Sequence, residues 1–269
     1  MNLPTTMKVI TINNRKGGVG KTSITLGVGT TLAQLGYRTL LVDLESQNNL
    51  TTGCLSPDVF NETHPILFDT LYAMAMGKTE SRWFNSIPCR SVAPNLHIIP
   101  SSRRMAGIEN ILAKFPDPLA AIPRVMNPLY DKYDYILLDC PPTAGLITLS
   151  AYLTSDYIYV PALLEDDSLA GAVAVAKDIK SYINKRRPDR KISGIILNQY
   201  NLRALLRQSV RKNFDKYFPG LVMDTVIHQS IAVGEAKRAR KGIVDYAPRS
   251  TVADDFTRLT QEMLKKQTR

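Results

Sequence analysis

Short runs of apolar residues, rich in Ile, Val, Leu and Tyr, recur along this chain. Most of them are continuous and do not alternate with polar positions, which is typical of strands that are covered on both faces. We therefore expect strands at 8–12, 39–42, 96–99, 135–138, 157–160, 192–197 and 221–227.

Stretches with helical spacing separate these runs, at 21–35, 66–76, 103–114, 118–130, 166–186, 202–217, 231–240 and 250–266. Strands that alternate with helices predict an α/β fold with a doubly wound, mostly parallel sheet and helices on both faces. The chain contains no internal repeat, low-complexity tract or long linker, so we expect a single domain over 1–269. The segments 53–65 and 77–94 are the least regular.

A glycine-rich loop at 16–22 joins the first expected strand to the first expected helix. In that setting, backbone N–H groups and the helix N-terminus surround the phosphates of a nucleotide. The lysine that ends the loop would reach the β- and γ-phosphates, and the threonine after it would contact Mg²⁺. The predicted nucleotide-binding residues of this segment are Lys16, Gly17, Gly18, Val19, Gly20, Lys21, Thr22 and Ser23.

Lys16 is an additional lysine at the start of this loop, where a phosphate-binding loop needs no cation. With Asn13, Asn14 and Arg15 before it, the segment resembles the deviant Walker A box of the ParA and MinD ATPases. The resemblance extends from about residue 7 to residue 265. It implies a P-loop NTPase whose homodimer encloses ATP, with Lys16 in contact with the nucleotide of the partner subunit.

Asp139 ends the apolar run 135–138 and is followed by Cys-Pro-Pro, as in the same family. A carboxylate at this point is the Walker B arrangement, which holds Mg²⁺ directly or through water. The sequence therefore predicts ATP and Mg²⁺ as ligands, with Thr22 and Asp139 at the metal. Catalytic roles are predicted for Lys16, Lys21, Asp43 and Asp139.

Asp43 follows the run 39–42 and begins a segment that resembles the family motif Val-Asp-x-Asp-Pro-Gln-Gly-Asn. The resemblance assigns Asp43 to the attacking water, and a carboxylate there can orient water in line with the γ-phosphate. Glu45, Ser46 and Asn48 depart from the motif. Loss of its Pro and Gly is expected to relax the turn.

Three later residues fall at nucleotide contacts of the family. Glu165 resembles the glutamate that faces the partner's nucleotide. Asn198 lies where the family uses Asn for the adenine edge, which needs a donor and an acceptor; a turn-forming Asn fits the same sequence. His228 and Gln229 replace the family's Pro-Arg, and we interpret His228 as part of the wall around the base.

Positive charge is concentrated in the later part of the chain. Residues 175–269 contain 21 Lys and Arg against 9 Asp and Glu, whereas residues 1–174 contain 13 against 15. This asymmetry favours a polyanionic partner, with nucleic acid first and an anionic membrane second. The predicted contacts with DNA phosphates, without sequence preference, are Arg203, Arg207, Arg211 and Lys212 in one cluster and Lys237, Arg238, Arg240 and Lys241 in another.

Cysteine spacing and hydropathy exclude several classes of protein. Cys54, Cys89 and Cys140 are too widely spaced for a disulfide framework, a zinc ribbon or the paired ligands of an iron–sulfur protein on this fold. No apolar stretch approaches the ~20 residues that span a bilayer, and a strand begins too early for a signal peptide. We expect a cytoplasmic protein associated with the nucleoid.

The family resemblance implies a weak ATPase that binds double-stranded DNA as an ATP dimer. An adaptor of the ParB type, or another cargo adaptor, would stimulate hydrolysis and release the dimer. The cargo would be a plasmid or chromosome partition complex, or a protein assembly such as a carboxysome. We expect a short form of the family, without an N-terminal helix-turn-helix domain. The alternative is a MinD-like membrane ATPase, which would need an amphipathic C-terminal helix that lies at the membrane interface. In this chain the apolar stripe of such a helix would consist of Phe256, Leu259, Met263 and Leu264.

Overall fold

A seven-stranded sheet forms the centre of the molecule. The computed structural model describes residues 7–61, 64–77, 87–200 and 206–267, with side chains for all of these except 206–209. The strand order is β3-β4-β2-β5-β1-β6-β7, and within it only the edge pair β3–β4 is antiparallel. The strands are β1 (Lys8–Ile12), β2 (Thr39–Asp43), β3 (Arg90–Ala93), β4 (Leu96–Ile99), β5 (Tyr135–Asp139), β6 (Tyr157–Ala162) and β7 (Gly194–Leu197).

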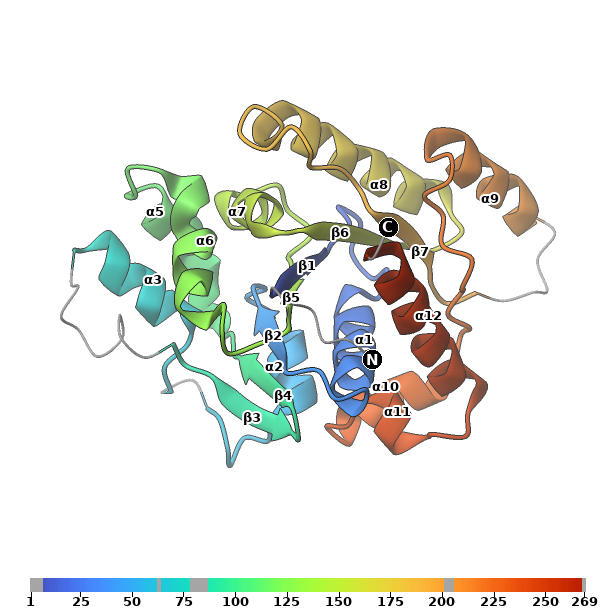
Figure 1. Ribbon diagram of the computed structural model, residues 1–269, viewed down its shortest axis with the longest axis horizontal. Coiled ribbons are helices and arrows are strands. Elements are labelled where there is room, and N and C mark those ends of the chain that lie inside the picture. Colours follow the sequence, from blue (N-terminus) through green and yellow to red (C-terminus); the bar gives the residue numbers. More distant parts are fainter. Residues whose placement is uncertain (1–6, 62–63, 78–86, 201–205, 268–269) are drawn as a thin grey trace.

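Helices cover the sheet on both faces, which confirms the predicted doubly wound α/β fold. Figure 1 shows α7 and α8 on one side of the strands and α1 and α12 on the other. The α-helices of the described residues are α1 (Lys21–Gln34), α2 (Asn49–Cys54), α3 (Leu67–Ala75), α5 (Ile108–Leu112), α6 (Ala121–Met126), α7 (Leu146–Thr154), α8 (Asp166–Asp178), α9 (Leu206–Tyr217), α10 (Ile231–Arg238), α11 (Ile243–Tyr246) and α12 (Thr251–Gln267).

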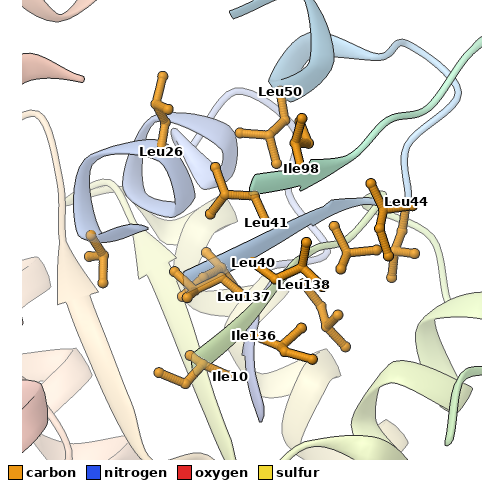
Figure 2. Packing of buried hydrophobic residues seen from close by; sticks show 14 of the residues in the cluster. Ile10, Leu26, Leu40, Leu41, Leu44, Leu50, Ile98, Ile136, Leu137 and Leu138 are labelled. Atoms are coloured by element: carbon orange, nitrogen blue, oxygen red, sulfur yellow. The ribbon is translucent and has the colours of Figure 1, made fainter. Parts of the chain in front are cut away.

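The central strands are apolar on both faces because both faces are packed. Every residue of β2 and β5 is buried, and Figure 2 shows their leucines among side chains from α1, α2 and β4. Leu41 packs against α1 where a Cβ on Gly29 would lie only 2.5 Å from its Cδ2 atom. A small residue in α1 therefore lets the helix that follows the glycine-rich loop lie close to the sheet.

The expected strand at 221–227 is wrong. Beyond an isolated bridge between Ile195 and Val222, this segment forms no ladder with β7. The carboxylate of Glu262 in α12 accepts hydrogen bonds from the backbone N–H groups of Asp224 and Thr225, each at 2.9 Å. A side chain thus takes the donors that a further strand pairing would have used.

Other boundaries also differ from the expected pattern. The segment 118–130 is divided into short helical pieces, with prolines at the start of two of them. The segment 166–186 becomes α8 followed by one π-helical turn, Ile179–Ile183. Two elements were not expected from the sequence. They are helix α7, which follows β5, and strand β3, which forms one edge of the sheet.

Helix α12 is part of the core. The Phe256 ring, 1% exposed, lies over α1 at Gly27, where a Cβ would be 2.3 Å from a ring carbon. Leu259 and Met263 are buried beside it. The apolar stripe that a membrane-associated helix would need is therefore covered by protein. Among the described residues, no helix has the length and apolar character to cross a bilayer.

Candidate functional site

The glycine-rich loop follows β1 at the edge of the sheet where the parallel strands end. Gly18 and Gly20 have φ values of 76° and 87°, which favour glycine, and a Cβ on Gly17 or Gly18 would meet no atom within 4 Å. Helix α1 starts directly after the loop, and no side chain caps its N-terminus. The open loop and the uncapped N–H groups fit a phosphate group.

Lys21 extends back along the loop instead of out into solvent. Its side chain is 7% exposed overall, and Nζ lies 3.4 Å from the carbonyl oxygen of Lys16. Burial lowers the pKa of Lys21, against the opposing effects of Asp139 and Glu45. A buried ammonium group at the mouth of the loop fits an anionic ligand, as predicted for this lysine.

The two predicted carboxylates lie side by side. Asp43 and Asp139 are register partners on β2 and β5, and both are buried. Burial raises the pKa of each carboxyl group, and the charge of Asp43 raises that of Asp139 further. The Thr22 hydroxyl donates to Asp139 Oδ2 at 2.8 Å. The loop threonine and the predicted Walker B aspartate are thus in direct contact.

This arrangement fits Mg²⁺. Two buried carboxylates beside one lysine favour additional positive charge, and Mg²⁺ is commonly held by one or two protein oxygens together with water and substrate phosphates. The described residues contain no group of three or more His, Cys, Asp or Glu side chains that could hold a metal by themselves. Thr22 and Asp139 would be the protein ligands of such an ion.

Asp43 is held by the turn that follows β2. Its Oδ2 accepts from the backbone N–H and the hydroxyl of Thr51, at 2.9 and 2.7 Å, and Oδ1 accepts from the N–H of Glu45. Asn48, where the family motif has Gly, takes a left-handed conformation with φ 48°. Ser101 donates its hydroxyl to the Glu45 carbonyl. The expected relaxation of the turn is therefore countered by local hydrogen bonds.

Helix α8 braces the start of the loop. Asn14 Nδ2 donates to the carbonyls of Pro161 and Ser168, at 2.8 and 3.2 Å, and Oδ1 accepts from the N–H of Lys16 at 2.9 Å. Gly171 lets the helix approach, because a Cβ there would lie 2.1 Å from Asn14 Oδ1. The backbone of the predicted dimer-contacting lysine is thus fixed by β6 and α8.

Charged side chains of α8 contact the same segment. Lys16 Nζ lies 2.8 Å from Asp167 Oδ2, and this contact raises the pKa of the lysine. Arg15 forms an ion pair with Asp178 at 2.7 Å. Glu165, predicted to face the partner's nucleotide, is exposed immediately before α8. Sequence reasoning missed Asp167 and Asp178, because their distance from the loop in the sequence hides the contact.

A cavity of about 340 Å³ opens beside the loop, lined by Asn198 and His228 among others. Asn198 is 6% exposed, and its Nδ2 donates to the Val19 carbonyl at 2.8 Å. A Cβ on Gly20 would lie 2.1 Å from that nitrogen, so glycine is needed here. The structure thus brings both predicted base contacts to one cavity next to the predicted phosphate site.

The described residues of the two predicted DNA-binding clusters lie on different helices, the first cluster on α9 and the second on α10 and the residues that follow it. Figure 1 shows α9 and α10 on opposite sides of α12. Arg203 lies outside the described residues, and the side chain of Arg207 is not described, whereas Lys212 is exposed and Arg211 half-buried. In the second cluster, two of the four residues contact α2 or the residue that follows it.

Lys237 and Arg240 connect the second cluster to the segment that holds Asp43. Lys237 Nζ lies 3.2 Å from Asn49 Oδ1 at the start of α2, and Arg240 Nε donates to the Leu55 carbonyl at 3.1 Å. Arg238 and Lys241, the other members of the cluster, are exposed. Positive side chains therefore cover one side of α2 and leave part of their charge facing solvent.

Comparison with known proteins gives consistent matches over the length of the chain. Residues 7–215 match the family described as AAA domain. The sporulation initiation inhibitor protein Soj of Bacillus subtilis (strain 168) is 32% identical, with 95% of this chain and 98% of Soj covered. The chromosome partitioning protein ParA of Caulobacter vibrioides (strain NA1000 / CB15N) is 30% identical, with 97% and 95% covered. Among solved structures, an ATP complex of a McdA variant from Cyanothece has the same fold, with a TM-score of 0.81, 19% identity and 96% of each chain covered.

Proposed function

We propose that this chain, which belongs to the AAA-domain family and is related over nearly its full length to the partition proteins Soj and ParA, is an ATPase that positions a cargo while bound to DNA without sequence preference. It would bind ATP with Mg²⁺, form a homodimer around the nucleotide and bind the nucleoid in the cytoplasm. An adaptor of the ParB type, or another cargo adaptor, would stimulate its weak hydrolysis and release it from DNA. Plasmid and chromosome complexes and protein assemblies are all compatible cargoes.

The observation that carries the proposal is the combination of Lys16 with the buried carboxylate pair. Thr22, Asp139 and Asp43 lie together where the glycine-rich loop meets the ends of β5 and β2. Lys16 lies beside α8, where its side chain contacts Asp167. Because this ion pair is exposed, the lysine can exchange it for a contact with another anion. A lysine in that place suits a phosphate of a partner's nucleotide, which explains why the loop begins with a second cation.

Different residues of the chain would have different roles in phosphoryl transfer. The loop backbone and Lys21 would bind and neutralise the phosphates, while Thr22 and Asp139 would hold Mg²⁺, which supplies positive charge to the phosphate oxygens. Asp43 would orient the attacking water after exchanging part of its contact with Thr51. Asn198 and His228 would contact the base, and Glu165 would face the partner's nucleotide.

Nucleotide-dependent DNA binding tests the proposal. Binding to a random-sequence duplex would be measured with ATP, ADP or no nucleotide, for the wild type, Asp43→Ala and Lys16→Ala. We expect binding only with ATP, retained or strengthened in Asp43→Ala because hydrolysis is needed for release, and lost in Lys16→Ala although ATP still binds. No ATP-dependent binding at modest salt would refute DNA-based positioning, and anionic liposomes would then be the next surface to test.

The DNA surface needs a separate experiment. We expect Lys241→Glu, and independently Lys212→Glu, to weaken ATP-dependent DNA binding and to reduce its salt dependence, because each removes a phosphate contact. Lys114→Glu, a charge reversal of an exposed residue in the less basic part of the chain, is the matched control. Equal effects of the three variants would show that only overall charge matters and that neither cluster is the binding surface.

A further inference from the structure

Helix α7 follows the predicted Walker B aspartate closely in the chain. The segment 140–145 joins Asp139, at the end of β5, to the first residue of α7. Pro141 and Pro142 restrict its backbone, and the Pro142 carbonyl accepts a hydrogen bond from Arg15 Nε at 3.3 Å. Because the segment is short and stiff, a shift of the α7 N-terminus would be transmitted to Asp139.

The N-terminus of α7 is capped by a distant side chain. Gly145 occupies the N-cap position, so the helix has no capping side chain of its own. Glu109 of α5 takes that place, since its Oε2 accepts from the backbone N–H of Leu146 at 2.6 Å and its Oε1 from that of Ile147 at 3.4 Å. Figure 1 shows α5 beside α7. A negative charge at this end of a helix also interacts favourably with the helix dipole, so the carboxylate fixes the start of α7.

Glycine at position 145 leaves room for this contact. A Cβ on Gly145 would lie 2.2 Å from Glu109 Oε1 and 2.6 Å from its Cδ. The φ of Gly145, −71°, suits any residue, so the close approach of the carboxylate favours glycine here and backbone strain does not. The local sequence of α7 is therefore matched to a residue of α5.

The segment that carries Glu109 begins at Ser101, beside the turn that holds Asp43. The buried Ser101 donates its backbone N–H to Thr51 Oγ1 at 2.8 Å and its hydroxyl to the Glu45 carbonyl at 2.6 Å. The Thr51 hydroxyl in turn donates to Asp43 Oδ2 at 2.7 Å. One short segment thus contacts the turn after β2 at its start and the helix after β5 at its end.

We propose that Glu109 is a positioning residue for ATP hydrolysis, which fixes the start of α7 and, through the segment 140–145, the place of Asp139 relative to Asp43. The inference rests on the proposed hydrolysis and adds to it a residue bonded to α7 instead of to the glycine-rich loop. Phosphoryl transfer depends on the positions of the groups around the phosphate, so a displaced Asp139 would slow the reaction. Nucleotide affinity depends mainly on the loop backbone and Lys21, and should change little.

Separate measurements of rate and affinity distinguish this role from a structural one. Hydrolysis in a single turnover, with protein in excess over ATP, and the dissociation constant of ADP would be measured with Mg²⁺. We expect Glu109→Ala to lower the rate about tenfold and to change the ADP affinity less than about twofold. Glu109→Gln should recover most of the rate, because its carbonyl oxygen can still accept from Leu146. Asn110→Ala, at an exposed neighbour in α5, is the matched control and should keep the wild-type rate.

A second variant displaces the carboxylate without removing it. Gly145→Ala places a Cβ against Glu109 and should lower the rate as Glu109→Ala does, but it should add little in the double variant, where the obstructed side chain is gone. Thermal unfolding would establish that each variant is folded at the assay temperature. A wild-type rate in Glu109→Ala, a loss of ADP affinity as large as the loss of rate, or additive effects in the double variant would overturn the inference and leave the proposed function standing. Absence of hydrolysis in the wild type would overturn both.

Discussion

Substitution of Gly171 by Ala tests how α8 holds the start of the glycine-rich loop. A Gly→Ala change inside a helix ordinarily stabilises a protein by about 0.5–1 kcal/mol. Here the new Cβ would lie 2.1 Å from Asn14 Oδ1 and 2.9 Å from the backbone nitrogen of Lys16. Backbone cannot yield as a flexible side chain does, so either α8 moves away from the loop or the buried Asn14 is displaced.

The magnitude follows from the hydrogen bonds of Asn14. Its side chain makes three, to Pro161, Ser168 and Lys16, each contributing about 0.5–1.5 kcal/mol to stability. Losing most of them outweighs the gain in helix propensity, and overpacking of a core typically costs about 1–3 kcal/mol. We therefore expect Gly171→Ala to lower the free energy of unfolding by about 1–3 kcal/mol.

Gly234→Ala is the matched control for this experiment. Gly234 also lies inside a helix, α10, but it is exposed and a Cβ there would come no closer than 4.0 Å to the Arg238 side chain. Guanidinium denaturation should show this variant to be as stable as the wild type or more so. Gly171→Ala should in addition impair ATP-dependent dimerisation, measured by light scattering. If the two variants are equally stable, the proposed brace does not constrain the loop.

Three further predictions concern other contacts. Asp134→Asn should destabilise the fold by about 1–3 kcal/mol at pH 7, because the carboxylate accepts hydrogen bonds from Arg38 that the amide cannot all replace. Burial raises the pKa of Asp134, but the hydrogen bonds from Arg38 outweigh burial and lower it, so the stability difference between wild type and variant in denaturant unfolding should be largest at pH 7 and should shrink as pH falls through that lowered pKa. Asp167→Asn should release Lys16 from its ion pair and lower the ATP concentration needed for half-maximal dimerisation about two- to fivefold, as measured by light scattering. An unchanged midpoint would refute the idea that Asp167 competes with the nucleotide for Lys16. Phe256→Ala should destabilise the fold by about 3–5 kcal/mol in denaturant unfolding, since it empties the space over α1, and a smaller loss would mean that α12 is loosely packed.

The central features of the fold and the phosphate site were predictable because their determinants are local in the sequence. The buried strands β2 and β5 are apolar throughout, and the loop between β1 and α1 carries its glycines and lysines in one continuous segment. Asp43 and Asp139 each end such a strand, and parallel strands place their ends at one edge. Periodicity and strand ends were therefore sufficient for these elements.

The remaining features depend on contacts between distant segments. Helix α7 is apolar on most positions because it is covered on nearly all sides, so the sequence shows no polar face by which to recognise it. The segment 221–227 is rich in β-forming residues, but the Glu262 carboxylate takes two of its backbone donors. The pairs Lys16–Asp167 and His228–Asp255 join elements that only the tertiary structure brings together. No local pattern identifies such partners.

The contacts of α2 couple two surfaces that would otherwise be independent. Thr51, in the middle of α2, donates a hydrogen bond to Asp43. Lys237 contacts the first residue of α2, and Arg240 contacts the residue that follows its last. A DNA phosphate that draws these cations away from α2 would weaken the hold on the proposed hydrolytic carboxylate. Thermodynamic reciprocity then requires that a nucleotide state which tightens α2 around Asp43 weakens the affinity for phosphate by the same factor. DNA binding and ATP hydrolysis would thus be coupled through a helix of only six residues.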